Sequence, residues 1–346
     1  MSATISPMTG LWYGVERVCA AWDYPRSSYY SRQRQYTANT ELPREKRGPK
    51  TDLCDTDLLA LIRHDLQESP WQGEGHRKVW ARLRLVKGIP VARKRVLRIM
   101  RENHLLSPHR FVHPPHDHDG EIGTDKPNDM WGTDGTQVLT VEDGNVWIFT
   151  AIEHWNAECV GYYVCKYGNR YNAIQPTAQG LLKYFGALDA ACGLGLSVRH
   201  DYGSVYTSDH FQNQLKYWAI ASSFAFVREP ETNGIAERFF RTLKEQIIYG
   251  RIYRNLEEVR QAVERFVDLY NGQWRIEKNG FLTPNEMRQK YLTKLAASWY
   301  NQIKLQSQTC VQKTGCSTRM PQNQGGIECI YWFAVELIID AVCSWL

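Results

Sequence analysis

The sequence predicts an α/β region with a mixed five-stranded sheet flanked by helices, preceded by all-α helix-turn-helix modules. Residues 130–250 alternate β-rich runs with helical patterns in the order β-β-β-α-β-α-β-α, which places helices on both faces of a mixed sheet. Residues 1–103 instead hold helical patterns joined by turns. Residues 1–110 carry 20 Lys and Arg against 11 Asp and Glu, whereas the remainder has a net charge of −4. This basic excess indicates nucleic-acid binding by the N-terminal part, with an ordinary solvated surface as the alternative.

Length and composition are typical of a globular protein of two or three domains, with 346 residues and 43% hydrophobic residues. The nine cysteines are scattered and form no C-x-x-C pair, so neither a zinc ribbon nor a redox pair is indicated. The sequence has no signal peptide pattern and no apolar run of 18 residues. We therefore expect a cytoplasmic protein with reduced thiols and no membrane partner.

Residues 1–52 predict a helix-turn-helix and a basic linker. Val15, Val18, Cys19 and Trp22 share one helical face, and Pro25 suits the first turn of a second helix. Any small helical hairpin would give the same pattern. Residues 35–52 are polar and basic, which suits a flexible linker that follows a phosphate backbone.

Residues 53–103 predict a second helix-turn-helix-like DNA-binding module. Leucines from residue 58 to 66 give the first helix, and Pro90 suits the start of the last one. Basic side chains of this module are candidates for contacts with phosphates or a groove. They are Arg77, Lys78, Arg93, Lys94, Arg95 and Arg98.

Residues 104–129 form a linker rich in His and Pro, which contains five of the ten histidines. Imidazole and carboxylate groups suit zinc or nickel, so a metal site is one interpretation. The segment has no periodic scaffold to hold ligands together, and a solvated linker is the interpretation that we favour.

The predicted sheet takes three strands from residues 131–165, a fourth that ends at Asp201, and a short fifth at 224–227. Helices are predicted at 172–185 and 209–221. A further helix starts near Glu237, with Asn233 as a good N-cap and phosphate contact. Its apolar stripe consists of Ile235, Phe239, Leu243 and Ile247.

A second face of this last helix combines Glu237 with two cations, Arg241 and Lys244, within about 60° of one another. Asp201 stands at a strand end, so its carboxylate and that of Glu237 can converge on one metal. Asp134, in M-W-G-T-D-G-T, is the best candidate for the third carboxylate needed to hold two ions.

These acids carry a specific resemblance. The 35 residues between Asp201 and Glu237, with the flanking P-E-T-N-G-I-A-E-R-F-F-R-T-L-K-E, resemble the catalytic core of the retroviral-integrase superfamily. Within that superfamily the chain resembles the second-frame product of two-reading-frame bacterial insertion-sequence transposases, from about residue 15 to about residue 292.

The resemblance implies a ribonuclease H-like fold for a catalytic core at 130–250 and a helical extension at 251–302. It implies that Asp134, Asp201 and Glu237 bind two Mg²⁺ or Mn²⁺ ions and catalyse DNA cleavage and strand transfer. The implied partners are double-stranded DNA (terminal inverted repeats and target), further copies of this chain, and a protein from an upstream frame. Arg238, Arg241 and Lys244 would position DNA.

Two alternatives remain open: a nuclease of the same fold that cuts without joining, and an inactive DNA-binding relic that represses its own element. The chain also departs from the family pattern at two places. Tyr202-Gly203 stands where Asn-Gly is usual after the second Asp, and residues 272–278 replace a basic Arg-Pro-His stretch.

Residues 303–346 form an atypical tail, with four of the nine cysteines and an apolar end. The tail is interpreted either as a partner-binding helix or, preferably, as translation past the usual end of the gene. We expect strand transfer to survive its deletion.

Overall fold

The computed structural model describes residues 3–38, 52–107, 123–224 and 234–313. Its contacts divide the chain into two compact units, Met1–Asp57 and Leu58–Leu346, which are described separately below.

The first unit contains two helices, α1 (Gly14–Ala21) and α2 (Arg26–Ala38), and confirms the helical pair predicted there. Asp23 takes a left-handed conformation (φ 46°) in the turn between them, and Pro25 directly precedes α2. Cys19 is buried, and Arg26 forms an ion pair of 2.9 Å with Glu16 across the turn.

A helical module opens the main body of the chain. It comprises α3 (Asp55–Glu68), α4 (His76–Ala81), the π-helical turn η1 (Arg82–Val86) and α5 (Arg93–Glu102). Its small core is fully or almost fully buried and consists of Leu58, Ile62, Val79, Leu83, Val96 and Met100. The prediction that Pro90 begins the last helix is wrong, because Ala92 is the extended N-cap and α5 starts at Arg93.

The α/β region contains five strands: β1 (Met130–Thr140), β2 (Gly144–Glu153), β3 (Cys159–Cys165), β4 (Ser197–His200) and β5 (Ala221–Phe224). Their order in the sheet is β3-β2-β1-β4-β5. The pairs β1–β2 and β2–β3 are antiparallel, whereas β1–β4 and β4–β5 are parallel. The structure thus confirms the mixed five-stranded sheet.

The helices between the strands are α6 (Arg170–Ala173), α7 (Gln175–Phe185), α8 (Ser204–Thr207) and α9 (Asp209–Tyr217). Four predicted bounds are wrong. The helix expected at 172–185 is interrupted at Ile174, β4 ends at His200 instead of Asp201, α9 ends at Tyr217, and β5 begins at Ala221 instead of Phe224. The last shift arises because parallel pairing with β4, which matches Ser197 to Ala221, draws a small polar segment into the sheet.

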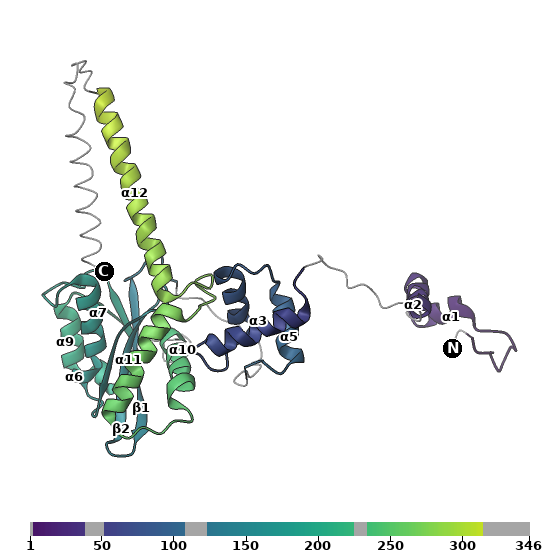
Figure 1. Ribbon diagram of the computed structural model, residues 1–346, viewed down its shortest axis with the longest axis horizontal. Helices are drawn as coiled ribbons and strands as arrows, with labels where there is room; N and C mark the ends of the chain where they lie inside the picture. The colour runs from purple at the N-terminus through teal and green to yellow at the C-terminus, as the bar shows by residue number, and fades with distance from the viewer. Residues whose placement is uncertain (1–2, 39–51, 108–122, 225–233, 314–346) are drawn as a thin grey trace. The chain divides into compact units, whose positions relative to one another are not determined.

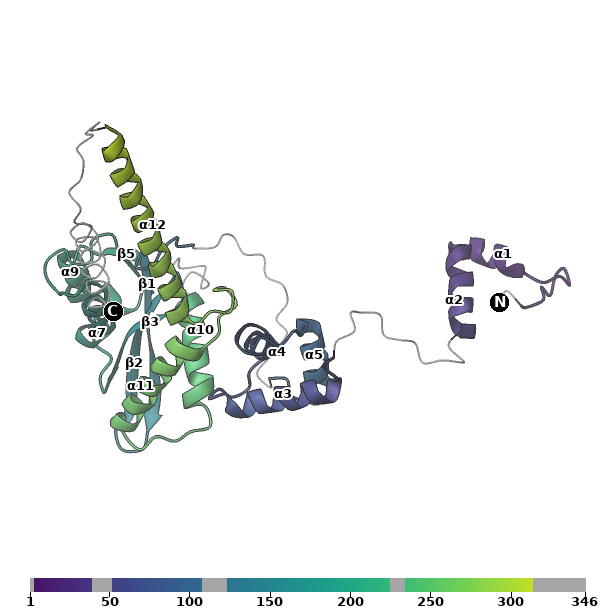
Figure 2. The same ribbon diagram turned by 45° about the horizontal axis from the view of Figure 1, so that its top comes forward.

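Helices cover both faces of the sheet, in three layers (Figures 1 and 2). Successive residues of β2 point to opposite faces, so Ile148 enters one core and Phe149 the other. The Ile148 core packs against α10 (Gly234–Leu243) and α11 (Leu256–Gln273), and the Phe149 core against α6, α7 and α9. The sheet is therefore buried on both sides.

The predicted apolar stripe of α10 is confirmed: Phe239, Leu243 and Ile247 are buried, and Ile235 packs against the same core. The helix continues as a π-helical turn, η3 (Lys244–Ile248), before α11. The last helix, α12 (Pro284–Lys313), runs without interruption through residues 302 and 303, where the sequence predicted a boundary. The remainder of the predicted tail, residues 314–346, lies outside the described part. No helix within the described ranges is long and apolar enough to cross a membrane.

The helical module packs directly on α11 and η3. The indole of Trp71 is almost buried and contacts Phe266 and Trp274 edge to face, with ring centroids 5.9 and 4.8 Å away. The side-chain amide of Gln246 accepts from the backbone N–H of Gln72 and donates to its carbonyl, both at 2.9 Å. These contacts join the module to the helices that cover the sheet.

Candidate active site

The parallel pairing of β1 with β4 places two of the predicted acids side by side. Gly132 is paired with Arg199, and the same register, two residues further along each strand, sets Asp134 beside Asp201. Neighbouring strands lie about 4.8 Å apart. Asp201 directly follows the last residue of β4, and its Oδ1 accepts from the backbone N–H of Gly203 at 2.9 Å.

Strand alternation directs Asp134 toward the helix that carries the third acid. Asp134 and Val138 lie on the same face of β1, and Val138 belongs to the core formed with α10. Glu237 is exposed in the first turn of α10, while Lys244 lies half-buried in η3. The helix thus brings a carboxylate and a cation to the face that holds Asp134.

The pKa of Asp134 reflects the charges of the three other groups. Burial, together with the charges of Asp201 and Glu237, raises the pKa of Asp134 to about 6. The backbone N–H of Gly135, at 2.7 Å from the carboxylate, and the ammonium group of Lys244 oppose this rise. Asp134 is therefore the carboxylate on which the charges of the others converge.

Carboxylate oxygens are the donors that Mg²⁺ and Mn²⁺ prefer, and the mutual repulsion of three acids is what a cation relieves. Within the described ranges, however, no three His, Cys, Asp or Glu side chains come close enough to enclose one ion. Two of the carboxylates are instead turned to local backbone amides, those of Gly135 and Gly203. The donor chemistry fits a divalent ion, and binding requires these side chains to turn toward it.

Glycine is required directly after Asp134. A Cβ atom at Gly135 would lie 2.6 Å from a ring carbon of Phe149, which is fully buried. Any larger residue would require this buried ring to shift.

The sequence analysis missed two buried residues behind the acids, Tyr206 and His200. The Tyr206 ring stacks on His200, with centroids 5.6 Å apart, and burial together with the charges of Asp134 and Asp201 raises the pKa of its phenol. His200 Nδ1 lies 2.8 Å from the carbonyl of Asp201 and its Nε2 2.9 Å from the Ser222 hydroxyl. Burial lowers the pKa of His200, so the ring is neutral. A lone His and a lone Tyr carry no local signal of this arrangement.

The predicted DNA-contacting residues fall into separate groups. Arg238 and Arg241 are exposed on α10, and Asn233 lies outside the described residues. Within the module, Arg77 and Arg93 both pair with Glu277, and the Lys78 ammonium lies over the Trp274 ring.

Two further residues of that predicted set lie on α5. Arg98 pairs with Glu102 at 3.1 Å, and Lys94 is exposed. Arg95 is half-buried. In the described part of the chain, none of these contacts joins the cations of the helical module to Asp134, Asp201 or Glu237. Their role in DNA binding stays a prediction.

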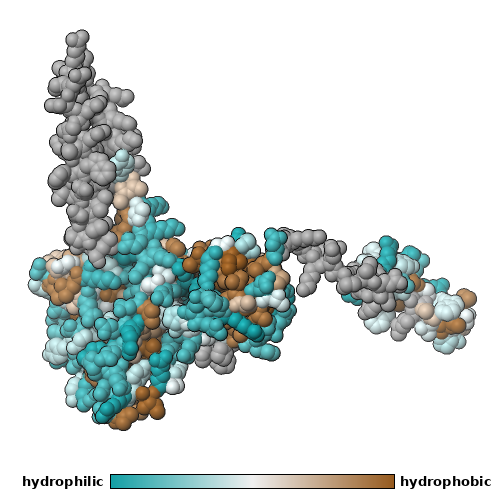
Figure 3. All heavy atoms as spheres, viewed as in Figure 1, coloured by the Kyte–Doolittle hydropathy of each residue, from teal (hydrophilic) through white to brown (hydrophobic). Residues whose placement is uncertain are grey.

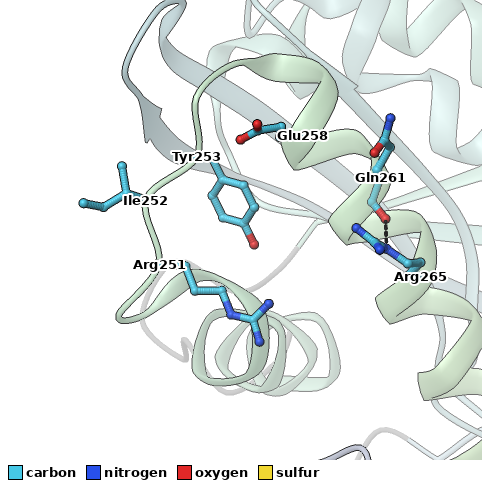
Figure 4. Close-up of a pocket in the computed structure, with 6 residues that line it drawn as sticks. All are labelled: Arg251, Ile252, Tyr253, Glu258, Gln261 and Arg265. Atoms are coloured by element: carbon cyan, nitrogen blue, oxygen red, sulfur yellow. Dashed lines mark hydrogen bonds between the residues drawn. The ribbon is translucent and has the colours of Figure 1, made fainter.

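One open pocket lies at the other end of β1 and is lined by Arg251, Ile252, Tyr253, Glu258, Gln261 and Arg265 (Figure 4). Tyr253 is bridged to Thr140, six residues and therefore about 20 Å along the strand from Asp134. Exposed Leu139 and Val141 make this end of the sheet apolar on the surface (Figure 3). The pocket is distinct from the acidic site.

The pKa of Asp134 predicts how this carboxylate affects stability. A folded-state pKa of about 6, above the ordinary 3.8, means that ionisation of Asp134 costs stability as the pH rises from about 4 to above 6. Without divalent cations, Asp134→Asn is therefore expected to be more stable than the unsubstituted protein at pH 7.5, by about 1–3 kcal/mol, and equally stable near pH 4. Urea unfolding followed by tryptophan fluorescence measures this difference.

The matched control is Asp268→Asn, which removes an exposed acid from α11. Adding Mg²⁺ should stabilise the unsubstituted protein more than Asp134→Asn. Equal stability of the two proteins at pH 7.5 would show that the Asp134 carboxylate is not buried beside the other two carboxylates.

Two protein-family models match the chain. An integrase core domain matches residues 219–284, and an HTH-like domain matches residues 55–111. The first match includes Glu237 but not Asp134 or Asp201, whereas the second covers α3, α4, η1 and α5.

Solved structures similar to this chain include retroviral integrases. The catalytic core of HTLV-2 integrase in complex with magnesium is 14% identical, with a TM-score of 0.35, covering 47% of this chain and 97% of that one. The catalytic core of BIV integrase is 19% identical, with a TM-score of 0.36, covering 48% and 97%.

Curated relatives include transposases of Escherichia coli. The transposase InsD of insertion element IS2A/D/F/H/I/K is 30% identical over 209 residues, which are 59% of this chain and 68% of that protein. InsD of IS2-9 from strain K12 has the same identity over 209 residues, 66% of its length. With these relatives, the chain belongs to the family of insertion-element transposases.

Proposed function

We propose that this chain cleaves DNA strands at the ends of an insertion element and joins them to target DNA. The observation that carries the proposal is the convergence of Asp201, Glu237 and Lys244 on Asp134, within β1 and beside the carboxyl end of β4. The integrase core model and the transposase relatives support the same reaction class. Such a protein acts on DNA in the bacterial cytoplasm, at the nucleoid.

In the first step a water oxygen attacks the scissile phosphorus, and the bond to the 3′ oxygen breaks. In the second step the freed 3′-hydroxyl attacks a phosphorus of another strand, and a new phosphodiester replaces the old one. Two divalent ions, Mg²⁺ or Mn²⁺, would neutralise charge on the attacking and leaving oxygens when bound. Asp134, Asp201 and Glu237 would hold these ions.

The cations of α10 and η3 have a different task. Lys244 is close enough to lower the pKa of Asp134 and would hold a phosphate oxygen beside the acids. Arg238 and Arg241 are exposed one turn apart on the same helix and would contact the flanking backbone. The three cations together orient the phosphodiester and offset the repulsion between its charge and the three carboxylates.

The partners implied by this reaction are the terminal inverted repeats of the element and a target duplex. The match to an HTH-like domain supports DNA binding by the module of α3 to α5. Two ends must be held together for joining, so we propose a homo-oligomer on DNA. A second protein from an upstream reading frame is a further proposed partner.

Linear DNA carrying matched inverted repeats, incubated with the protein and Mg²⁺, tests the function. Products cut at the element end and joined to a second duplex are expected. Cutting without joining would identify a simple nuclease, and binding without cutting would identify an inactive DNA-binding relic or repressor.

The contribution of α5 to DNA binding can be measured separately. Replacing Arg93, Lys94 and Arg95 by Ala should weaken end binding and flatten its dependence on salt, by about 0.9 log units per lost phosphate contact. Because Arg93 already pairs with Glu277, we expect Lys94 to contribute more than Arg93. Fluorescence anisotropy at several salt concentrations gives the slope, and Lys290→Ala on α12 is the control. An unchanged slope would show that this helix does not touch the backbone.

A further inference from the structure

Two aromatic rings lie exposed beside the acidic site. Tyr202 directly follows Asp201 and is 55% exposed, and Phe224, the last residue of β5, is 37% exposed. Their rings are stacked, with centroids 5.0 Å apart and an angle of 27° between their planes. This pair is a feature of this sequence, because Tyr202 stands where the family pattern usually has Asn.

Buried aromatic residues pack against this exposed pair. Phe224 contacts His200 edge to face at 4.7 Å, and His200 stacks on Tyr206, which in turn contacts Phe211 at 5.3 Å. His200, Tyr206 and Phe211 are all buried. Because both ring nitrogens of His200 are engaged, by the Asp201 carbonyl and the Ser222 hydroxyl, the support under Phe224 is fixed. The two exposed rings are therefore pre-oriented.

A phosphodiester bound at the acids brings its own nucleotides next to Tyr202. Bases within a duplex have both faces covered by their neighbours, so they offer no face to an aromatic side chain. A base that has left the stack does offer one, and stacking on an aromatic ring is tolerant of base identity. Tyr202 presents such a ring one residue from Asp201.

We propose that Tyr202 and Phe224 form a stacking platform for an unpaired nucleobase next to the scissile phosphate. The occupant is a base from the element end whose pair opens when the strand enters the acidic site. The platform stabilises the opened end, so that the strand can reach Asp134 and Asp201 without its complement. This inference rests on the proposed cleavage and joining of DNA ends.

The test compares three variants on two kinds of DNA end. Tyr202→Leu removes the ring, Tyr202→Phe keeps it, and Tyr217→Leu is the matched control, because Tyr217 is 54% exposed at the end of α9, near the amino end of β5. One set of ends is fully paired, and the other carries mismatches at the terminal base pairs. Single-turnover cleavage is measured with saturating protein and Mg²⁺.

On paired ends, Tyr202→Leu is expected to cleave about 5- to 150-fold more slowly, the range for the loss of one base–aromatic stack. On mismatched ends the terminal pairs are already open, so no opening step depends on the ring, and the saturated rate of Tyr202→Leu stays near that of the unsubstituted protein. Tyr202→Phe and Tyr217→Leu should cleave both ends at the unsubstituted rate. 2-Aminopurine placed at the terminal positions should be quenched on binding, and less so with Tyr202→Leu.

Equal slowing of Tyr202→Leu on both ends would overturn the platform, because it would mean that Tyr202 only supports the Asp201 loop. Unchanged rates on both ends would overturn it as well. These outcomes leave the proposed function standing. If the unsubstituted protein cuts no DNA, the function fails, and Tyr202-dependent quenching of 2-aminopurine then decides the platform alone.

Discussion

Replacing Glu237 by Gln is expected to abolish both cleavage and joining while DNA binding persists. Gln keeps the size of the side chain and its exposed place in the first turn of α10, but it removes the charge that a metal ligand and the field at Asp134 require. We expect a loss on the order of 10³-fold or more, equivalent to about 4 kcal/mol of transition-state stabilisation. Strand transfer on pre-cut ends and cleavage on intact ends are measured separately.

The control is Glu264→Gln. Glu264 is exposed on α11 and acts electrostatically on Tyr162 of β3, two strands away from Asp134. This variant should retain full activity. Anisotropy with end DNA shows whether Glu237→Gln still binds, so that loss of chemistry is separated from loss of substrate. Strand transfer by Glu237→Gln at the unsubstituted rate would refute the assignment of the three acids.

The arrangement of the acids was predictable because it depends on local patterns and on topology. Period-2 alternation identified β1 to β3, and the stripe through Phe239 and Leu243 fixed which side of α10 is buried. A parallel β1–β4 pair then sets Asp134 beside Asp201 wherever the rest of the chain lies. The β1–β4 pairing itself joins residues 67 positions apart, and it was expected from the family resemblance and not from a local pattern.

The contacts of the helical module could not be predicted in the same way. Gln72 and Gln246 are 174 residues apart, and their hydrogen bonds leave no periodic trace in the sequence. Residues 272–278, which differ from the family pattern, hold the helical module in place, because Trp274 packs on Trp71 and Glu277 pairs with Arg77. Arg77 and Lys78, which the sequence predicts to contact DNA, thus also make contacts within the protein, and their role in DNA binding stays a prediction.

A buried ionic network links α12 to the sheet. Its ion pairs could not be predicted from the sequence either. The Arg288 guanidinium lies between two carboxylates that are almost fully buried, with Nη2 at 3.5 Å from Glu153 and Nε at 2.5 Å from Glu158. Glu153 also accepts from the indole N–H of Trp131 at 3.1 Å. Trp131 precedes Asp134 by three residues on β1, so this network holds the strand that carries the central acid.

Removing the cation of this network is expected to cause the largest loss of stability. Arg288→Met leaves Glu153 and Glu158 buried without their shared partner, and such a loss typically costs about 3–5 kcal/mol. Arg288→Lys keeps the charge but loses the forked geometry, and we expect a smaller loss. The double variant Arg288→Met with Glu158→Gln should be more stable than Arg288→Met alone, because one orphaned charge is removed. Urea unfolding of the four proteins measures these differences in stability.

The pH dependence distinguishes this electrostatic account from a loss of packing. Burial alone would raise the pKa of Glu158, but Arg288 and Lys183 hold it below its usual range, so its stabilising contribution is present above pH 4.5. Without Arg288, burial dominates and the folded-state pKa rises above 4.5. Arg288→Met should therefore gain stability as the pH is lowered from 7 toward 4.5, while the unsubstituted protein does not gain from the protonation of Glu158. A destabilisation that is the same at pH 5 and pH 7 would mean that Arg288 acts through packing against Tyr184, whose ring lies 4.0 Å from the guanidinium.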